Sequence, residues 1–194
     1  QHNFTNDENT KAVIYVVRDP RNVITSISNH YTLSIKESLK FMLSDTIIGN
    51  KKSFEESYKE KKSGILTLLG RWNNHYRSWT RKKDNLLIIK YEDLVLNPKS
   101  EIMKISLFLK KYINFEVNEN KYNNILKTTA FENLKKMENE EPFKESVLNK
   151  ETKSKVNFFN LGPENKWQNK LNDNVVEIIK KNFRKEMTEI GYLG

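Results

Sequence analysis

Two unbroken apolar runs predict the strands at the centre of the molecule. Residues 12–17 read AVIYVV and residues 86–89 read LLII, without the polar alternation of a strand that has one wet face. A short continuous apolar run is typical of a strand buried on both faces of a parallel sheet. We therefore predict two such strands, the second within the stretch Asn85–Asp93.

A helix should follow the first strand directly. Asp19 is a favourable N-cap residue, and Pro20 suits the first helical position. The helix separates apolar from polar positions: Val23, Ile24 and Ile27 share one face, and Asn22, Ser26 and Asn29 lie on others. Arg18, which closes the strand, and Ser26 can therefore converge where open α/β sheets bind anions and nucleotides. An ordinary strand–turn–helix with a solvated Arg is the alternative.

Two further helices are predicted between the strands. Ser34 and Glu37 make a capping-box pattern for a helix with the inward residues Leu39, Phe41, Met42 and Ile47. The polar stretch Gly49–Glu60 predicts a loop or an exposed helix, and a long helix should then begin at Ser63. Its apolar residues recur every three or four positions, which indicates packing in the core: Ile65, Leu68, Leu69, Trp72, Tyr76 and Trp79.

The remaining sequence predicts two helices and an irregular stretch. Asn97 and Pro98 repeat the cap-plus-proline pattern, before a helix with Ile102, Ile105 and Leu109 facing inward. The charged stretch Met137–Val156 has no clear periodicity and predicts a surface loop. An amphipathic helix closes the chain, with one apolar face made of Val175, Ile178, Ile179, Phe183 and Met187.

Composition indicates one folded domain. The 194 residues are 37% hydrophobic and 30% charged, and no apolar run approaches the roughly 18 residues of a membrane helix. The absence of cysteine excludes disulfides, thiolate metal sites and cysteine nucleophiles, and it indicates a reducing, cytoplasmic setting. The net charge of +9 suits anionic partners, although lysines scattered for solubility explain it more simply. Three scattered histidines make no convincing metal site.

The segment YVVRDPRNVITS, residues 15–26, resembles the 3′-phosphate-binding segment of the sulfotransferases that use 3′-phosphoadenosine 5′-phosphosulfate (PAPS). In that family an Arg ends the strand and a Ser eight residues later lies on the next helix, which is the spacing of Arg18 and Ser26. The resemblance implies that both side chains hold the 3′-phosphate of the cofactor.

Three further segments resemble landmarks of this family, in the same order along the chain. LLIIKYEDLVLNP implies that Tyr91 lies on the adenine side of the cofactor pocket. TTAFENL implies that Thr129 and Phe131 flank the adenine, for which an aromatic face is a suitable platform. NFFNLGPENKWQN matches the last landmark through Gly162 and Trp167.

The last landmark departs from the family pattern. Asn160 and Leu161 stand where Arg-Lys usually precede the Gly, and a neutral pair cannot make the same charge-assisted hydrogen bonds to a phosphate. Backbone N–H groups around Leu161 and Gly162 can still bind an anion, and Arg21 is another cation that can cover the loss. We therefore keep Asn160, Leu161 and Gly162 among the predicted cofactor-binding residues.

The resemblance implies an α/β fold, a three-layer parallel sheet flanked by helices of the P-loop-NTPase-like sulfotransferase type. The family normally begins with a strand, a Gly-rich loop that cradles the 5′-phosphosulfate and carries a Lys, and a helix. No GxxxxGK[ST] pattern can be written across the six glycines. We therefore expect residues 1–194 to be one domain of a bacterial sulfotransferase-domain protein, lacking this N-terminal unit and with the catalytic Lys upstream. The stretch Met137–Val156 would then correspond to a mobile segment over the active site.

The implied reaction moves a sulfuryl group from PAPS to an acceptor hydroxyl or amine. Positioning and cationic groups assist the departure of 3′,5′-ADP, while a His takes the acceptor proton, for which His2 is the candidate. A P-loop-related kinase or other nucleotide binder, and a relative that binds without transferring, stay open as alternatives. We expect no nucleic-acid partner, because Arg and aromatic residues are not interleaved on one face, and no metal or membrane span. The acceptor stays open among carbohydrate, lipid, phenol and peptide.

Overall fold

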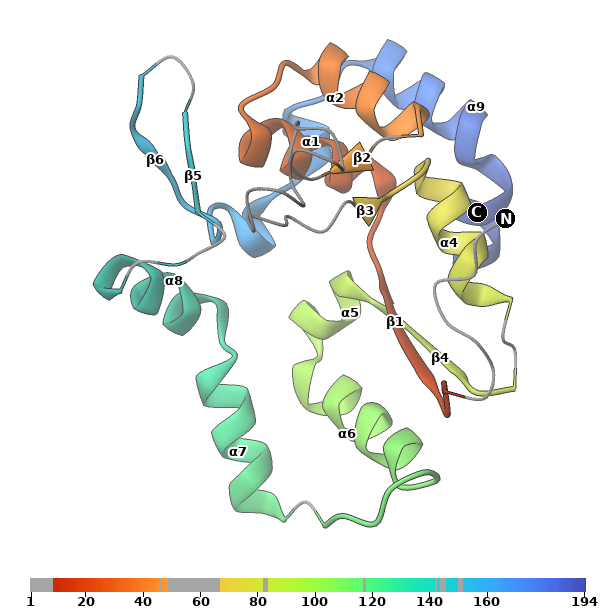
Figure 1. Ribbon diagram of the computed structural model, residues 1–194, viewed down its shortest axis with the longest axis vertical. Helices are drawn as coiled ribbons and strands as arrows, with labels where there is room; N and C mark the ends of the chain where they lie inside the picture. The colour runs from red at the N-terminus through yellow and green to blue at the C-terminus, as the bar shows by residue number, and fades with distance from the viewer. Residues whose placement is uncertain are drawn as a thin grey trace, which may run out of the picture.

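A two-stranded parallel sheet lies at the centre of the molecule (Figure 1). The computed structural model describes residues 9–45, 47–48, 67–81, 84–116, 118–141, 143, 146–149 and 152–194. Here β1 (Val13–Val17) pairs with β4 (Leu86–Lys90) along its whole length. Two antiparallel ladders form separate small sheets, β2 (Ile47–Ile48) with β3 (Thr67–Leu68), and β5 (Val147–Leu148) with β6 (Lys155–Val156).

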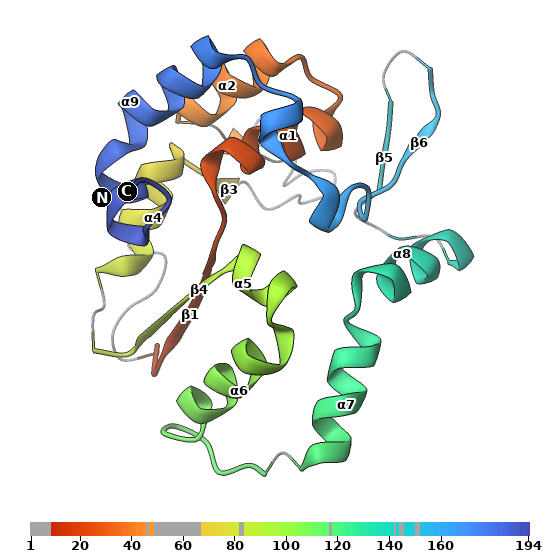
Figure 2. The same ribbon diagram turned by 180° about the vertical axis from the view of Figure 1, so that it is seen from behind.

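The helices fall into two groups around this sheet, as the front and back views show (Figures 1 and 2). The upper group holds α1 (Pro20–Tyr31), α2 (Ile35–Leu43), α4 (Trp72–Thr80) and α9 (Asp173–Ile190). The lower group holds α5 (Tyr91–Leu96), α6 (Pro98–Leu109), α7 (Glu119–Thr128) and α8 (Phe131–Glu140). Two short 3₁₀ turns, η1 (Gly162–Glu164) and η2 (Trp167–Asn169), precede α9.

The first helix begins as predicted. The side chain of Asp19 caps α1 by accepting the backbone N–H of Arg21 at 2.9 Å, and Pro20 occupies the first turn. A capped start lowers the cost of leaving the first helical N–H groups without partners. The capping box of α2 is also confirmed, since Ser34 and Glu37 each bond to the backbone N–H of the other.

The main core lies between α1, α2 and α9. Its buried members are Ile24, Met42, Ile179, Phe183 and Met187, each at most 3% exposed. Trp72 of α4 adjoins this core, with its ring centroid 5.2 Å from that of Phe183. A second cluster lies where α4 covers β1, and its buried members are Val13, Tyr15, Val17 and Tyr76. The predicted packing role of the apolar stripes in α1, α4 and α9 is confirmed.

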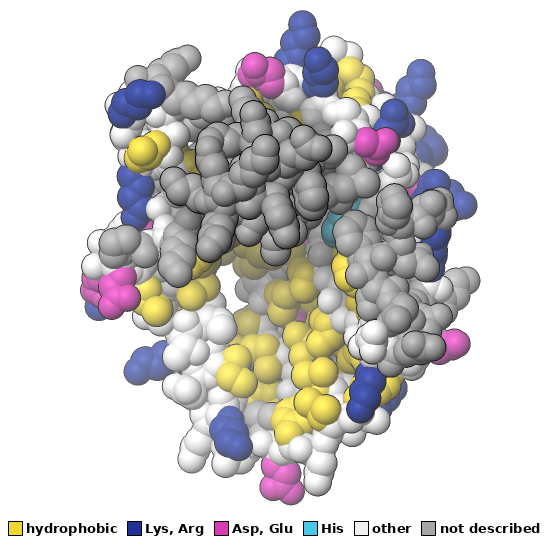
Figure 3. Space-filling view, viewed as in Figure 1, with side chains coloured by type: hydrophobic (Ala, Val, Ile, Leu, Met, Phe, Trp, Pro, Cys, Tyr) yellow, Lys and Arg dark blue, Asp and Glu magenta, His cyan; other side chains and the backbone are white. Residues whose placement is uncertain are grey.

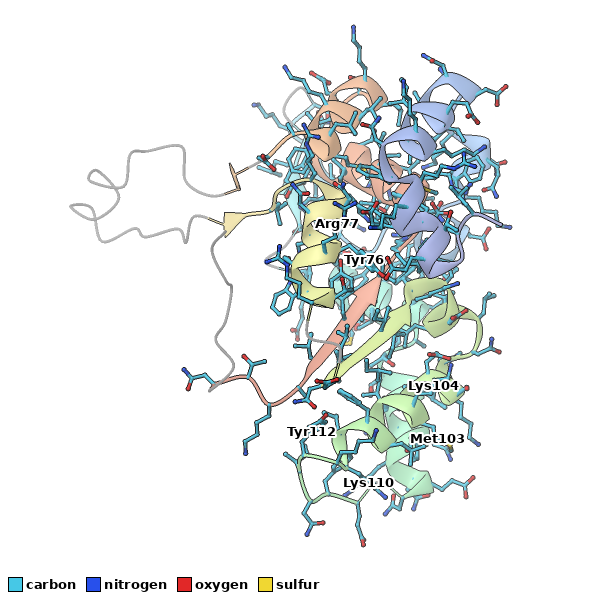
Figure 4. The ribbon with its side chains drawn as sticks, turned by 90° about the vertical axis from the view of Figure 1, so that its right-hand side faces the viewer. Tyr76, Arg77, Met103, Lys104, Lys110 and Tyr112 are labelled. Atoms are coloured by element: carbon cyan, nitrogen blue, oxygen red, sulfur yellow. The ribbon has the colours of Figure 1, made fainter. Side chains whose placement is uncertain are left out.

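An ion pair joins α4 to α9. Figure 4 shows Tyr76 and Arg77 on α4 beside the C-terminal helix, and Arg77 pairs there with Glu186, whose side chain is 2% exposed. A buried carboxylate needs such a partner, because a lone charge is costly in apolar surroundings. The helix that covers β1 is thereby held against α9.

One prediction about the sheet is wrong for β1. Val13, Tyr15 and Val17 are buried, but Ile14 is 36% and Val16 49% exposed on the opposite face. The strand was predicted to be buried on both faces, yet only the face that α4 covers is buried, and the other face of β1 is partly exposed. We call Ile14 and Val16 the open face of the sheet. Figure 3 shows hydrophobic side chains gathered around a hollow in the same lower half of the molecule.

The helix predicted from Ser63 begins later than expected. Residues 67–68 form β3, and α4 starts only at Trp72. Gly70 adopts a left-handed conformation with φ 66°, which an α-helix cannot contain. The apolar spacing continues across this glycine, so the sequence pattern merged a strand and a helix. Ser63 itself, Ile65 and the stretch 49–60 lie outside the described residues.

Two strand and helix boundaries also differ from the prediction. The strand expected over Asn85–Asp93 ends at Lys90, and Tyr91 begins α5 instead. The acidic residues that follow Tyr91 suit the positive end of a helix. Ile47 lies in β2 rather than on α2.

The α6 helix begins after Asn97 as predicted, but its buried residues differ. Glu101, Ser106 and Phe108 are buried, whereas the residues predicted to face inward are half-buried: Ile102, Ile105 and Leu109. The prediction of a surface loop over Met137–Val156 is wrong for its described residues, which include the end of α8 and the β5–β6 hairpin (Figure 1). The role of this stretch as a lid stays a prediction. Within the described ranges no helix is long and apolar enough to cross a membrane.

Candidate functional site

Arg18 follows the carboxyl end of β1 and is held on two sides. Its Nη1 donates to Ser26 Oγ at 2.9 Å, and its guanidinium carbon lies 4.3 Å from the centroid of the Tyr91 ring. Stacking on an aromatic face holds the guanidinium without occupying its N–H groups. The buried Nε of Arg18 has no hydrogen-bond partner among the described residues. Three predicted site residues therefore meet at one strand end, with donor capacity left for an anion.

The polar stripe of α1 (Asn22, Ser26 and Asn29) binds the docking segment, which we define as residues 158–167. These three positions are about one helical turn apart, so they lie along one side of the helix. Each bonds to a different residue of the segment: Trp167 N to Asn22 Oδ1 at 2.9 Å, Asn165 Nδ2 to Ser26 Oγ at 3.0 Å, and Asn160 Nδ2 to Asn29 Oδ1 at 2.5 Å. Segments more than 130 residues apart in sequence are thereby joined beside Arg18.

Gly162 lies against the ring of Phe131. A Cβ at this position would overlap the ring, and the backbone is left-handed with φ 47°. Both conditions require glycine here. The structure thus brings together Phe131 and Gly162, two residues that the sequence predicted for the site.

Thr129 is placed differently. It follows α7, is exposed, and donates its hydroxyl to the carbonyl of Ile125 at 2.7 Å. No contact recorded for the described residues joins Thr129 to Arg18 or Ser26. Its predicted role beside adenine stays a prediction.

Asn160 and Leu161 bring no charge to the site. The Asn160 amide is bonded to Asn29, while the backbone N–H of Leu161 makes no hydrogen bond within the part of the chain that the structure describes. An unpaired N–H next to a left-handed glycine is a group that can bind an anion. This arrangement is compatible with the predicted backbone role of Leu161 and Gly162.

Arg21, the further cation considered for the missing Arg-Lys charge, is engaged in contacts of its own. Its Nε and Nη2 bond to both carboxylate oxygens of Asp19, the closest at 2.7 Å, and its guanidinium carbon lies 4.4 Å from the Trp167 ring centroid. Its Nη2 also donates to the carbonyl of Tyr192 at 3.1 Å. Asp19 offsets the Arg21 charge, and the role of Arg21 as a further cation for the phosphate stays a prediction. Arg21 instead ties the start of α1 to the C-terminal residues.

A carboxylate under the site joins three parts of the chain. Glu92 accepts the backbone N–H of Asp19 at 3.1 Å and the hydroxyl of Tyr192 at 2.8 Å. Burial, together with the hydrogen bond to Glu92, raises the pKa of Tyr192, so its hydroxyl keeps its proton. The end of β1, the start of α5 and the C-terminal turn are thus held in one arrangement.

Sequence reasoning missed three polar residues that organise this region. Glu92 stood inside the Tyr-Glu-Asp motif, but only Tyr91 received a role. Glu138, 2% exposed, accepts the backbone N–H groups of Phe158 and Phe159 at 2.7 and 2.8 Å. Asn165 is 7% exposed and bonded to α1. A single acidic or amide residue has no periodicity, so only the motif around Glu92 offered a signal.

Of the two described histidines, His30 contacts the docking segment through Phe158, and His75 lies beside the second core. His2, the predicted base, lies outside the described residues. The ring of His30 packs between Tyr31 and Phe158, with centroids 4.7 and 5.8 Å away. The Nδ1 of His75 lies 3.0 Å from the Tyr15 hydroxyl. No group of three or more His, Asp or Glu residues in the described ranges is placed to hold a metal ion.

Comparison with known proteins gives the family of this chain. A family model described as "Sulfotransferase domain" matches residues 4–191. The chain belongs to the sulfotransferase domain family. Sulfotransferase 1B1 of Canis lupus familiaris is 29% identical over 185 residues, which cover 93% of this chain and 56% of that protein. This sulfotransferase-domain chain therefore spans about half the length of the curated relatives that it matches.

Two solved structures share the fold of this sulfotransferase domain. Mouse sulfotransferase SULT7A1 complexed with PAP gives a TM-score of 0.56 at 19% identity, covering 91% of this chain and 58% of that one. Retinol dehydratase in complex with androsterone and inactive cofactor PAP gives 0.53 at 20% identity, covering 91% and 47%. At such identities the likeness shows the fold alone, which is a helix-rich α/β fold with a small parallel sheet.

Proposed function

We propose that this chain forms the 3′-phosphate and adenine half of a PAPS site in a sulfotransferase. The observation that carries the proposal is the Arg18 group: a guanidinium stacked on Tyr91 and bonded to Ser26, with a buried N–H that has no partner among the described residues. Such donors at the carboxyl end of a parallel strand, beside a capped helix start, suit a phosphate. The two similar structures hold PAP, which is 3′,5′-ADP, and this supports the choice of ligand.

Each predicted residue has a role in this proposal. Arg18 and Ser26 donate hydrogen bonds to the 3′-phosphate, and the backbone N–H groups of Leu161 and Gly162 add to them. The Asn160 amide holds the docking segment on α1 rather than meeting the phosphate itself. Aromatic rings offer platforms for the adenine, from Tyr91 on one side and from Phe131, with Thr129 beside it, on the other.

The proposed reaction moves a sulfuryl group to an acceptor hydroxyl or amine. PAPS supplies that group when it is bound: the acceptor atom bonds to sulfur, and the bond from sulfur to the 5′-phosphate oxygen breaks. In this chain Arg18 and Ser26 orient the donor by its remote 3′-phosphate, so that its reacting end stays in position. His2 is the proposed base for the acceptor proton, and no described contact bears on that role.

The three-layer arrangement of the sheet and the cellular compartment of the protein are part of the same proposal. A third layer over the open face would complete the three-layer parallel sheet, and the exposed Ile14 and Val16 support such a layer. We propose the cytoplasm as the compartment on the lack of cysteine, and cell fractionation would test it.

Ligand binding by the protein and its variants tests the function. Isothermal titration should give tighter binding of 3′,5′-ADP than of 5′-AMP or ATP–Mg²⁺, because only the first presents a 3′-phosphate to Arg18. Hydrogen bonds to a charged group contribute about 1.5–3 kcal/mol, so Arg18→Ala should weaken 3′,5′-ADP binding roughly 10- to 100-fold. Arg184→Ala, an exposed arginine on α9, is the matched control and should bind like wild type.

The alternatives predict other outcomes of this titration. Preference for ATP–Mg²⁺ would favour a kinase-like nucleotide binder and contradict the proposal. Binding of 3′,5′-ADP by a protein whose upstream sequence lacks the Gly-rich loop and its Lys would indicate a relative that binds without transferring, because the proposed transfer needs that unit as well as this chain. The neutral pair Asn160 and Leu161 is the observation that favours this second candidate.

A further inference from the structure

Asn165 is the buried polar residue that the proposed site does not yet use. It lies between η1 and η2 in the docking segment and is 7% exposed. Its Oδ1 accepts from the Thr25 hydroxyl at 2.8 Å, and its Nδ2 donates to the Asn22 carbonyl at 3.3 Å and to Ser26 Oγ at 3.0 Å. A buried amide with every group directed at α1 is a specific arrangement rather than a solvated loop residue.

The structure places the amide nitrogen of Asn165 toward Asn22 and Ser26 and its amide oxygen toward Thr25. The carbonyl of Asn22 can only accept a hydrogen bond, which favours the amide nitrogen on that side, and the same carbonyl also accepts from the Thr25 hydroxyl at 2.8 Å. The same nitrogen then faces Ser26 Oγ, and the amide oxygen faces Thr25. In this orientation Asn165 is a hydrogen-bond donor to Ser26.

The hydrogen bond from Asn165 determines where the hydroxyl proton of Ser26 can point. A hydroxyl oxygen has two lone pairs and one proton. Arg18 Nη1 and Asn165 Nδ2 both donate to the Ser26 oxygen, at 2.9 and 3.0 Å, which occupies both lone pairs. The Ser26 proton is left to point elsewhere, and no acceptor for it lies among the described residues. Ser26 is thus set as a donor toward an anion beside Arg18.

We infer that Asn165 is a positioning residue that makes Ser26 a hydrogen-bond donor to the 3′-phosphate of the bound nucleotide. The inference rests on the proposed function, because it concerns the ligand of that same site. Asn165 acts through Ser26 and through the docking of its own segment on α1, without touching the nucleotide. Nothing in the sequence pattern singles out this asparagine, since the resemblance to the family rests on the glycine and tryptophan on either side of it.

A double-mutant cycle with two nucleotides tests the inference. Asn165→Ala should weaken 3′,5′-ADP binding about tenfold and leave 5′-AMP binding within about twofold, because only the first ligand presents a phosphate to Ser26. In a Ser26→Ala background, the same Asn165→Ala change should cost less than about twofold, because the hydroxyl on which it acts is gone. Asn182→Ala is the matched control, since this exposed α9 asparagine bonds only to its own helix at Ile178 in the described structure.

A second variant covers the case in which Asn165→Ala does not fold, as judged by circular dichroism. In Asn165→Ser the shorter side chain can still bond to Thr25 through its hydroxyl but cannot reach Ser26 as well. We expect the same selective loss of 3′,5′-ADP binding. Equal losses for both nucleotides, or an undiminished loss in the Ser26→Ala background, would show a merely structural role and overturn the inference alone. Wild-type protein that binds 3′,5′-ADP no better than 5′-AMP would overturn the proposed function and the inference together.

Discussion

At the scale of single residues, Gly162 shows how one position serves both the fold and the site. Its backbone is left-handed, and the Phe131 ring occupies the space where any other residue would carry a Cβ. The close approach brings an aromatic ring from the start of α8 to a turn that precedes α9. Two segments proposed to meet the nucleotide are thus held in contact by the absence of a side chain.

We predict that Gly162→Ala destabilises the protein and weakens 3′,5′-ADP binding. The left-handed backbone and the displaced Phe131 ring should together cost about 1–3 kcal/mol of the free energy of unfolding, measured by urea denaturation. Gly194→Ala is the control, because nothing lies within 4 Å of a Cβ added there. A Gly162→Ala protein with wild-type stability would mean that Phe131 moves away from this turn at no cost.

At the scale of elements, a buried carboxylate connects α8 to the docking segment. The two oxygens of Glu138 each accept one backbone N–H, from Phe158 and Phe159. The opposite end of that segment is bonded to α1 through Asn165 and Trp167. The segment is therefore held at both ends by side chains rather than by regular secondary structure.

We predict that Glu138→Gln lowers the free energy of unfolding by about 2 kcal/mol, because one backbone N–H loses a charged acceptor and meets an amide donor instead. Thermal or urea unfolding would measure this loss. Glu140→Gln on the same helix is the control: its carboxylate is 61% exposed and lies 3.6 Å from Lys136, so the change should stay under about 0.5 kcal/mol. Equal effects of the two substitutions would contradict the role given to Glu138.

At the scale of the whole molecule, burial of neutral titratable groups sets the pH range of stability. Burial lowers the pKa of His75, which lies beside the Tyr15 hydroxyl between α4 and β1. Burial also raises the pKa values of Tyr15 and Tyr192, and it raises that of Tyr76 to about 12 with help from the Glu189 charge. The fold therefore holds all four side chains in their uncharged forms.

We predict that the free energy of unfolding is greatest between about pH 6.5 and pH 10, the unperturbed values for His and Tyr. Below about pH 6.5 His75 binds a proton in the unfolded chain but stays neutral in the folded chain, because burial lowers its pKa. The free energy of unfolding therefore falls as the pH falls. Above about pH 10 the unfolded tyrosines ionise first, and stability falls again.

Urea unfolding from pH 5 to pH 11 would measure this profile. His75→Gln removes the titrating group and should flatten the slope between about pH 5 and pH 6.5, whatever its effect on stability at neutral pH. Parallel acid-side profiles for wild type and His75→Gln would rule out His75 as the source of that slope.

Local patterns predicted much of the fold because their causes are local. The cap at Asp19, the capping box at Ser34 and the apolar stripe of α9 each depend on residues within a turn or two, and each is confirmed. Boundaries failed where one residue interrupts a pattern that otherwise continues, as Gly70 does before α4. Burial of β1 failed on one face because an apolar strand does not reveal which elements cover it.

The sequence by itself determined the strand, the turn and the helix that carry Arg18 and Ser26, because strand apolarity, the Asp-Pro start and the helical offset act within a few residues. Only the tertiary structure decided what those side chains meet. The stacking of Arg18 on Tyr91, the hydrogen bond from Arg21 to the Tyr192 carbonyl and the hydrogen bond from Asn165 to Ser26 join residues far apart in the sequence. Hydrogen bonds and ion pairs over such separations depend on how the elements pack, and no spacing along the chain encodes that.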